Sequence, residues 1–232
     1  MHKDPHKRRG LGADRRETVD RVLAQRQPDL TVLAEALHKP RNFSAIIRTC
    51  DAVGINEVHA VPGEDGLAVH WNTSQGAEKW VSVCRHENLG DACRHLRGAG
   101  FQLIAAHLSE TAVDYREIDY TLPTALVVGT ELWGVSEAAL AEIDHEIVIP
   151  MKGMTQSLNV SVACAIVLYE ALRQRDAAGL YAKRRLRGEA HRRQRFEWLH
   201  PAVARFCQER GLDYPELDAE GRITGSFPRG GA

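Results

Sequence analysis

Apolar residues in the middle of the chain occur in short runs, and the segments between these runs have the length and pattern of helices. The runs are rich in Val, Ile and Leu, which is typical of strands that are buried on both faces. We predict strands at residues 30–37, 57–61, 81–85, 101–106, 125–129 and 147–150, and helices at 43–53, 89–99, 136–143 and 158–174. This alternation favours an α/β fold with a mostly parallel sheet that is covered by helices on both faces.

The two ends of the chain differ from its centre in charge. The overall net charge is −1, but residues 1–29 carry +3, residues 30–170 carry −9 and residues 171–232 carry +5. Residues 14–27 predict a short charged helix, and the basic stretch 183–195 precedes an amphipathic pattern suited to packing on the body of the protein. Basic arms beside an acidic centre indicate contact with a polyanion, although ordinary solvated helices explain the charge about as well. We expect an N-terminal extension (1–29), a central domain (30–175) and a C-terminal extension (176–232).

Several classes of protein are poorly supported by the composition. No apolar run reaches the roughly 18 residues of a membrane helix, and the basic N-terminus has no apolar stretch behind it, so we expect a cytoplasmic protein and no membrane contact. The five cysteines are scattered and form no CxxC pair, which favours reduced thiols. The eleven histidines form no HExxH motif and no His/Cys cluster with ligand spacing, so we expect no metal.

The first candidate site, residues 38–49, follows the predicted strand 30–37. Pro40 disfavours helix at the preceding residue, and Asn42 is well placed to cap the helix that follows. Ser44 and Arg48 are four residues apart and share a helical face, where Arg48 has apolar neighbours. The segment is therefore either a functional site or a surface arginine beside a capping asparagine.

The second candidate site, residues 127–135, joins a predicted strand to a helix. Gly129, Glu131 and Gly134 describe a tight loop in which a ligand can approach the backbone. Open α/β sheets bind ligands at the carboxyl ends of their strands. The segment does not fit GxGxxG, so a dinucleotide site is poorly supported, and an ordinary strand-to-helix turn remains an alternative.

The third candidate site, residues 147–163, is the most distinctive. A buried strand is expected to end at Pro150, and a glycine-containing loop then leads into a helix that begins with Ser157 and Asn159. Such a loop exposes backbone N–H and C=O groups that can bond the edge of an adenine, while two methionines and Leu158 can supply apolar walls. A plain crossover would leave the run Gln-Ser-Leu-Asn-Val-Ser unexplained.

Taken together, the three segments resemble the signature motifs of the SpoU/TrmH family of RNA 2′-O-methyltransferases, in the family's order and spacing. The resemblance runs from about residue 30 to residue 170. It rests on Asn42-x5-Arg48-Thr49, Gly129-x-Glu131-x2-Gly134, and Ile149-Pro150-Met151 through Ser157-Leu158-Asn159-Val160-Ser161. It implies a SPOUT-type α/β trefoil knot, one of the rare exceptions to the rule against threaded chains. It also implies a homodimer that binds S-adenosylmethionine in the knot, with the partner subunit completing the site.

The same resemblance assigns roles to individual residues. Arg48 would activate the ribose 2′-hydroxyl, and because arginine is normally always protonated, stabilising a developing alkoxide is easier to accept than full deprotonation. Leu132 stands where many relatives have lysine, which puts the holding of the substrate or of the loop in doubt. The residues implied to position Arg48 and the ribose are Asn42, Glu131, Ser157 and Asn159. Those implied to bind the methyl donor are Ala106, His107, Leu108, Gly129, Glu131, Ile149, Met151, Ser157 and Leu158.

The RNA substrate is inferred from the arms and from resemblance. About 30 residues precede the first predicted strand, too few for a separate N-terminal RNA-binding domain, and some 60 follow the core. This arrangement and residues 114–120 are similar to the subgroup that methylates a D-loop guanosine of tRNA. Residues expected to contact RNA phosphates are Lys39, Arg41, Lys183, Arg184, Arg185, Arg187, Arg192 and Arg193. Ribosomal RNA, another tRNA position, and a non-catalytic RNA-binding knot protein remain the alternatives.

Overall fold

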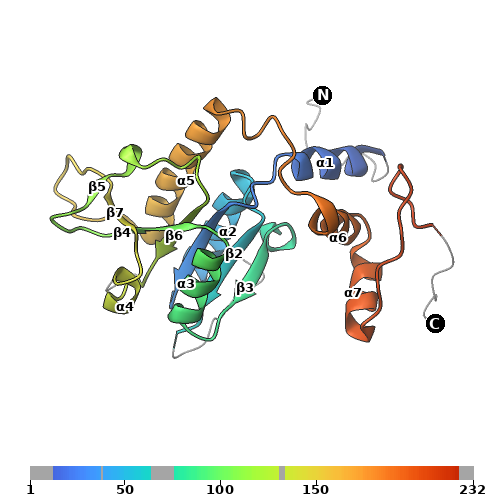
Figure 1. The fold of residues 1–232 in the computed structure, drawn as a ribbon, viewed down its shortest axis with the longest axis horizontal. Helices are drawn as coiled ribbons and strands as arrows, with labels where there is room; N and C mark the ends of the chain where they lie inside the picture. Colours follow the sequence, from blue (N-terminus) through green and yellow to red (C-terminus); the bar gives the residue numbers. More distant parts are fainter. Residues whose placement is uncertain (1–12, 38, 64–75, 131–133, 225–232) are drawn as a thin grey trace, which may run out of the picture. The chain divides into compact units, whose positions relative to one another are not determined.

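A computed structural model describes residues 13–37, 39–63, 76–130 and 134–224 of the chain (Figure 1). It contains two compact units. One comprises residues 26–183, and the other combines the described residues of 1–25 and 184–232. No helix in the described ranges is long and apolar enough to cross a membrane.

The larger unit is built around a seven-stranded sheet in which every strand pair is parallel. The spatial order of the strands is β3-β2-β1-β6-β4-β7-β5. Strand β6 is buried along its whole length, as the apolar run after Thr124 predicts. The strands are β1 (Leu30–Glu35), β2 (Glu57–Val61), β3 (Ser82–Arg85), β4 (Gln102–Ala106), β5 (Val113–Asp114), β6 (Thr124–Val128) and β7 (His145–Val148).

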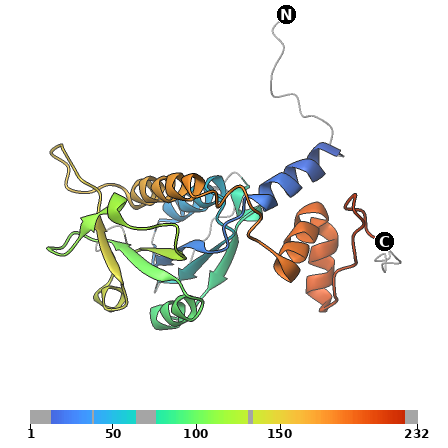
Figure 2. The ribbon, with the colours of Figure 1, turned by 45° about the horizontal axis from the view of Figure 1, so that its top comes forward.

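Helices cover both faces of this sheet, and each face has its own apolar core (Figure 2). On one face, α2 (Pro40–Ala52) and α5 (Val160–Ala177) pack against each other and against the central strands. On the other face lie α3 (Leu89–Gly98) and the short α4 (Glu137–Leu140). Two 3-10 turns, η1 (Ala77–Lys79) and η2 (Tyr115–Glu117), complete the unit. The predicted α/β fold with a parallel sheet covered on both sides is confirmed.

The smaller unit joins the two ends of the chain. It consists of α1 (Ala13–Ala24), α6 (Gly188–Leu199) and α7 (Pro201–Arg210). Arg15 donates a hydrogen bond of 2.7 Å to the carbonyl of Trp198, and the guanidinium of Arg195 lies 2.6 Å from the carboxylate of Asp20. Some charged side chains of the two extensions therefore bind one another or the backbone within this unit.

Arg175, near the end of α5, is completely buried and is bonded on several sides. Its guanidinium lies 2.8 Å from the carboxylate of Asp29 and donates to the Asp29 carbonyl, to Gln27 Oε1, and to the carbonyls of Tyr120 and Leu122. Asp29 directly precedes β1, and Leu122 lies two residues before β6. Arg175 therefore ties α5 to the starts of two neighbouring central strands.

Two local predictions need correction, and one strand was not predicted. Helix α2 begins at Pro40 rather than at residue 43, because proline is well tolerated in the first helical position, and extended Lys39 takes the cap position that was predicted for Asn42. Strand β7 covers His145–Val148 and is only partly buried, whereas a buried strand at 147–150 was expected. Strand β5 has only two residues and no apolar run, so the hydrophobic pattern did not indicate it.

Candidate active site

Three loops leave the sheet at the same edge because β6, β4 and β7 are parallel neighbours. The register pairs Ala105 with Val127 and Ala106 with Ile147, and the amide of His107 donates to the carbonyl of Ile147 at 3.1 Å. The carboxyl ends of these strands are where ligands bind in open α/β sheets. The loops carry the residues predicted to bind the donor, Ala106, His107, Leu108, Gly129, Ile149, Met151, Ser157 and Leu158, whereas Glu131 lies outside the described residues.

The loop after β6 requires glycine at its first position. Thr130 and Gly134 exchange two backbone hydrogen bonds, of 2.8 and 2.9 Å, which fold the loop back on itself. A Cβ atom on Gly129 would lie 1.9 Å from the carbonyl oxygen of Gly134. Gly134 itself has a φ of 71°, a backbone conformation that residues other than glycine rarely adopt. Glycine is therefore required at position 129 because there is no room for a side chain, and it is favoured at position 134 because of the backbone conformation.

The loop after β7 offers free backbone groups. Within the described ranges, no backbone–backbone hydrogen bond joins residues 151–156 to another part of the chain. Met151 and Leu158 are half-buried at the two ends of the loop, and the residues between them are exposed. Unpaired N–H and C=O groups beside apolar side chains match the polar edge and the flat faces of an adenine, so this donor set fits an adenosyl group.

Asn42 and Asn159 bring the first and third candidate sites into contact. Asn159 Nδ2 donates a hydrogen bond of 3.2 Å to Asn42 Oδ1, although the two residues are 117 positions apart. The Oδ1 atom of Asn159 caps α5 by accepting from the amide of Ser161 at 2.9 Å. One side chain thus starts the helix and holds the buried Asn42 of α2.

Arg48 lies one turn after Ser44 on α2, but the two side chains differ in environment. Ser44 is buried, whereas Arg48 is exposed, so the apolar surroundings expected for the guanidinium are not observed. Within the part of the chain that the structure describes, Arg48 makes no hydrogen bond or ion pair. Its guanidinium is therefore available to an anionic ligand. Ser157 is also exposed, and its carbonyl accepts from the hydroxyl of Thr155 at 2.9 Å.

Glu35, the last residue of β1, was not predicted but contributes to the site. Its carboxylate accepts a hydrogen bond of 2.5 Å from the hydroxyl of Ser136 and one of 3.1 Å from the Ser136 amide. Ser136 caps α4 and follows directly on the loop that contains Gly129 and Gly134. Glu35 therefore attaches this loop to β1. An acidic residue within the mostly apolar predicted strand 30–37 was the only sign of this role in the sequence.

The residues predicted to bind RNA are mostly exposed. Arg192 forms an ion pair with Glu189, and Arg187 caps α6 and donates to the carbonyl of Arg184 at 3.2 Å. In the smaller unit, Arg192 and Arg193 line a cavity of about 830 Å³, which also has aromatic walls. The exposed members of the predicted set are Lys39, Arg41, Lys183, Arg184, Arg187, Arg192 and Arg193, and Arg185 is half-buried.

Comparison with known protein families agrees with this geometry. The sequence model of the SpoU rRNA Methylase family matches residues 29–169, which include all three candidate sites. The chain belongs to this family. A second model, described as SpoU, rRNA methylase, C-terminal, matches residues 173–226. The resemblance inferred from the motifs is confirmed, and the match extends through most of the C-terminal arm.

Individual relatives of this SpoU-family protein are similar over most of its length. A tRNA (guanosine(18)-2′-O)-methyltransferase of Escherichia coli K12 is 50% identical over 204 residues, which are 87% of this chain and 89% of the relative. One from Thermus thermophilus is 54% identical over 80% of this chain and 95% of the relative. The crystal structure of the Aquifex aeolicus TrmH/SpoU tRNA modifying enzyme has a TM-score of 0.76 and 42% identity, covering 82% of this chain and 97% of that one.

A further solved structure contains a ligand. The SpoU methyltransferase AviRb from Streptomyces viridochromogenes, solved in complex with the cofactor AdoMet, is 29% identical. Its TM-score is 0.58, and the similarity covers 66% of this chain and 64% of that one. The shared fold therefore includes a member that binds the methyl donor.

Proposed function

We propose that the protein transfers a methyl group from S-adenosylmethionine to the ribose 2′-hydroxyl of guanosine 18 in tRNA. One observation carries this proposal. Three motif segments that are far apart in sequence lie at the same edge of the sheet, and Asn159 of the third segment donates a hydrogen bond to Asn42 of the first. The tRNA position is taken from the relatives that are 50% and 54% identical. A tRNA substrate would place the enzyme in the cytoplasm.

The donor would be held by the three loops at the carboxyl ends of β6, β4 and β7. When bound, S-adenosylmethionine supplies an electrophilic methyl group on a positively charged sulfur. The free backbone groups of residues 151–156 would bond the adenine edge, and Met151 and Leu158 would cover its faces. The fold of the loop between Gly129 and Gly134 would place its backbone beside the donor. We infer that these loops form the trefoil knot of the family, which the family membership supports.

Arg48 would act on the acceptor hydroxyl. A ribose hydroxyl is a poor nucleophile, so the negative charge that develops on its oxygen must be stabilised by a nearby cation while the proton passes to solvent or to an RNA phosphate. The exposed guanidinium of Arg48 can bind an RNA phosphate and stabilise the developing alkoxide while staying protonated. Asn42 and Asn159 would fix the ribose beside it, together with Ser157 and Glu131.

A homodimer would complete this site. Large apolar side chains are exposed in the half of the larger unit that holds the donor loops, which is unusual for a surface without a partner. Val162 and Tyr169 are 46% and 54% exposed on α5, and Met154, in the loop before it, is fully exposed. Light scattering should show a dimer, and Val162→Asp should give monomers that have lost methyl transfer.

The smaller unit would bind tRNA through phosphates. Replacing Arg184, Arg187 and Arg193 with alanine should weaken tRNA binding. In a plot of the logarithm of the binding constant against the logarithm of the salt concentration, the slope should become shallower by about one unit for each lost phosphate contact. Binding of S-adenosylmethionine, measured by calorimetry, should stay unchanged. The matched control is Arg94→Ala, because Arg94 is an exposed arginine of α3 that pairs only with Asp91 in the described ranges.

The experiment that tests the proposed reaction uses labelled donor and three RNAs. One is a tRNA transcript with guanosine at position 18, one carries 2′-deoxyguanosine there, and one is ribosomal RNA. We expect label only in the first, and we expect Arg48→Ala to abolish transfer while leaving donor affinity nearly intact. Label in the deoxy transcript would exclude the 2′-hydroxyl as acceptor, and preference for ribosomal RNA would exclude tRNA as the main substrate.

A further inference from the structure

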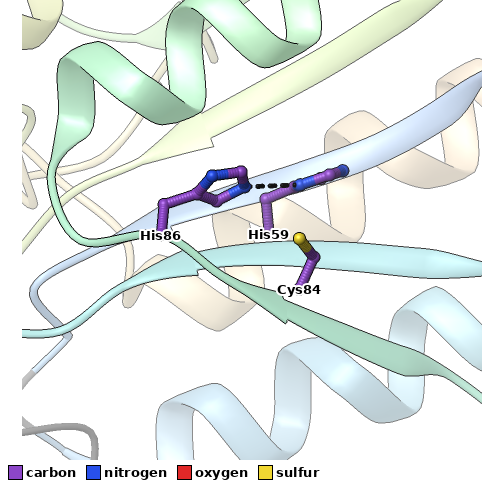
Figure 3. Close-up of side chains that lie close together, drawn as sticks. All are labelled: His59, Cys84 and His86. Carbon is purple, nitrogen blue, oxygen red and sulfur yellow. Dashed lines mark hydrogen bonds between the residues drawn. The ribbon is translucent and has the colours of Figure 1, made fainter.

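Two histidines and a cysteine meet on the sheet face that α3 covers (Figure 3). His59 lies in β2 and Cys84 in β3, and the parallel register places them directly opposite each other. His86 follows β3 and is two residues beyond Cys84, so it points to the same face of the sheet. Their possible ligand atoms all lie within 4.8 Å of one another.

We propose that His59, Cys84 and His86 form a binding site for one divalent transition-metal ion, with Zn²⁺ as the best match. Two imidazole nitrogens and a thiolate are ligands that zinc prefers, whereas magnesium and calcium require oxygen. The proposal goes beyond methyl transfer and does not depend on it. The sequence spacing predicted no metal, because His59 lies 25 residues before Cys84 and 27 before His86, and only strand pairing brings the three together.

The geometry of the cluster suits a metal after small side-chain rotations. His59 Nδ1 and His86 Nε2 are 2.9 Å apart, a distance at which one nitrogen donates a hydrogen to the other. Two ligands of a tetrahedral zinc ion, each about 2.0–2.1 Å from the metal, stand slightly farther apart than this. Both nitrogens must present lone pairs to the metal, so the hydrogen between them would move to the other nitrogen of its ring.

The surroundings favour neutral histidines and place a carboxylate near one of them. Burial, followed by the neighbouring His86 and His95, lowers the pKa of His59 to about 4, so its ring is uncharged at neutral pH. Burial also lowers the pKa of His86, against a smaller opposite effect of Asp91. The Nε2 atom of His59 lies 4.0 Å from the carboxylate of Glu57, which is beyond hydrogen-bond distance, so a small rotation would be needed for Glu57 to orient a metal-bound imidazole.

A third imidazole stands beside the cluster. The ring centroid of His95, on α3, is 5.4 Å from those of both His59 and His86. Because His95 is exposed, its side chain can turn toward a bound ion. We therefore expect it to strengthen binding without being required for it.

A metal here would connect β2, β3 and the chain that leads into α3, at the edge of the sheet. This edge is separated by β1 from β6, the first of the strands that carry the donor loops. The expected consequence is added stability rather than a part in methyl transfer. On binding, the Cys84 thiol, whose pKa is raised by burial and by Glu57, would release its proton to solvent.

The test is a metal titration of the full chain after treatment with a chelator. We expect one Zn²⁺ per chain with a dissociation constant below about 1 μM in competition with a chromophoric indicator. Co²⁺ should give a thiolate-to-cobalt charge-transfer band that disappears in Cys84→Ser. Zn²⁺ should raise the unfolding temperature of the wild type but not that of Cys84→Ser or His86→Gln, while methyl transfer at low temperature stays the same with and without metal.

Two controls separate the site from adventitious binding. His145→Ala removes an exposed histidine from β7, and Cys93→Ala removes a cysteine from α3, and neither should change stoichiometry or affinity. Circular dichroism of each metal-free variant establishes that it is folded. Affinity weaker than about 100 μM, or zinc binding unchanged in both Cys84→Ser and His86→Gln, would overturn the proposal and leave a hydrogen-bonded histidine cluster.

Discussion

Replacement of Arg175 with methionine should destabilise the larger unit far more than replacement of Arg173, two residues earlier on the same helix. Arg175 is completely buried and donates to five acceptors, whereas the side chain of Arg173 is 66% exposed and bonds only Glu170 among the described residues. The two variants remove the same chemical group from one helix. Their difference therefore measures what burial adds.

The magnitude follows from what the substitution leaves behind. Methionine fills much of the space, but the carboxylate of Asp29, only 16% exposed, loses its cation, and the side chain of fully buried Gln27 loses a partner. Removing one member of a buried ion pair costs about 3–5 kcal/mol. An exposed pair such as Arg173–Glu170 contributes about 0–1 kcal/mol. We therefore expect a difference of about 2–5 kcal/mol between the variants.

Urea unfolding followed by circular dichroism checks this expectation. Asp29→Asn, alone and combined with Arg175→Met, completes a double-mutant cycle, and we expect the second substitution to cost less once the first is present. Equal stabilities of Arg173→Met and Arg175→Met would refute the reasoning. So would strictly additive effects of the changes at Asp29 and Arg175, because they would show that the two side chains do not act as a pair.

Three further predictions concern the site and the histidine cluster. Asn159→Asp keeps an acceptor that caps α5 but loses the donor to Asn42, so it should retain stability and lose methyl transfer, whereas Asn159→Ala should also lose about 1 kcal/mol of unfolding free energy. Gly129→Ala should weaken donor binding by about tenfold or more in calorimetry, because its Cβ would collide with the loop, whereas Gly153→Ala, with open space around it, should not. The pKa of His59 is lowered to about 4 in the folded protein. As the pH falls, His59 is therefore protonated in the unfolded chain before it is protonated in the folded one. Metal-free protein should therefore lose up to about 3 kcal/mol between pH 6.5 and 4, and His59→Gln should lack this part of the loss.

Each of these expectations has a contrary outcome. Normal turnover in Asn159→Asp would show that its bond to Asn42 is not needed for the reaction. Equal donor affinities of Gly129→Ala and Gly153→Ala would mean that the fold of the loop does not control binding. The same dependence of stability on pH in the wild type and in His59→Gln would show that other groups, such as carboxylates, account for the loss.

Much of the fold could be predicted because its strands are buried on both faces. Residues 125–128, for example, form a continuous apolar run, as expected for a parallel strand that is covered on both faces. The start of α2 could not be placed by the same reasoning, since a polar residue such as Asn42 reads as a cap until its contact with Asn159 is known. Likewise, β5 contains only Val113 and Asp114 and is defined by its pairing with β7, which leaves no pattern in the sequence.

The candidate site was predictable where a motif is local and unpredictable where it depends on strand order. Gly129 and Gly134 lie in one loop, and their need for glycine follows from that loop's own backbone. Glu35 reaches Ser136 only because β1 and β6 are neighbours, and the two residues are 101 positions apart. His59 and Cys84 face each other for the same kind of reason, through the register of β2 and β3. No spacing rule along the chain contains this information.

Helix α5 connects these observations, because its two ends are fixed to different parts of the sheet. At its start, Asn159 caps the helix and bonds Asn42, and near its end Arg175 is bonded to the segments that precede β1 and β6. With a rise of 1.5 Å per residue, these two attachments are roughly 24 Å apart. A buried arginine far from the reacting groups therefore sets the position of a side chain at the site. If this is correct, Arg175→Met should lower turnover at temperatures where the protein is still folded, while donor affinity changes little.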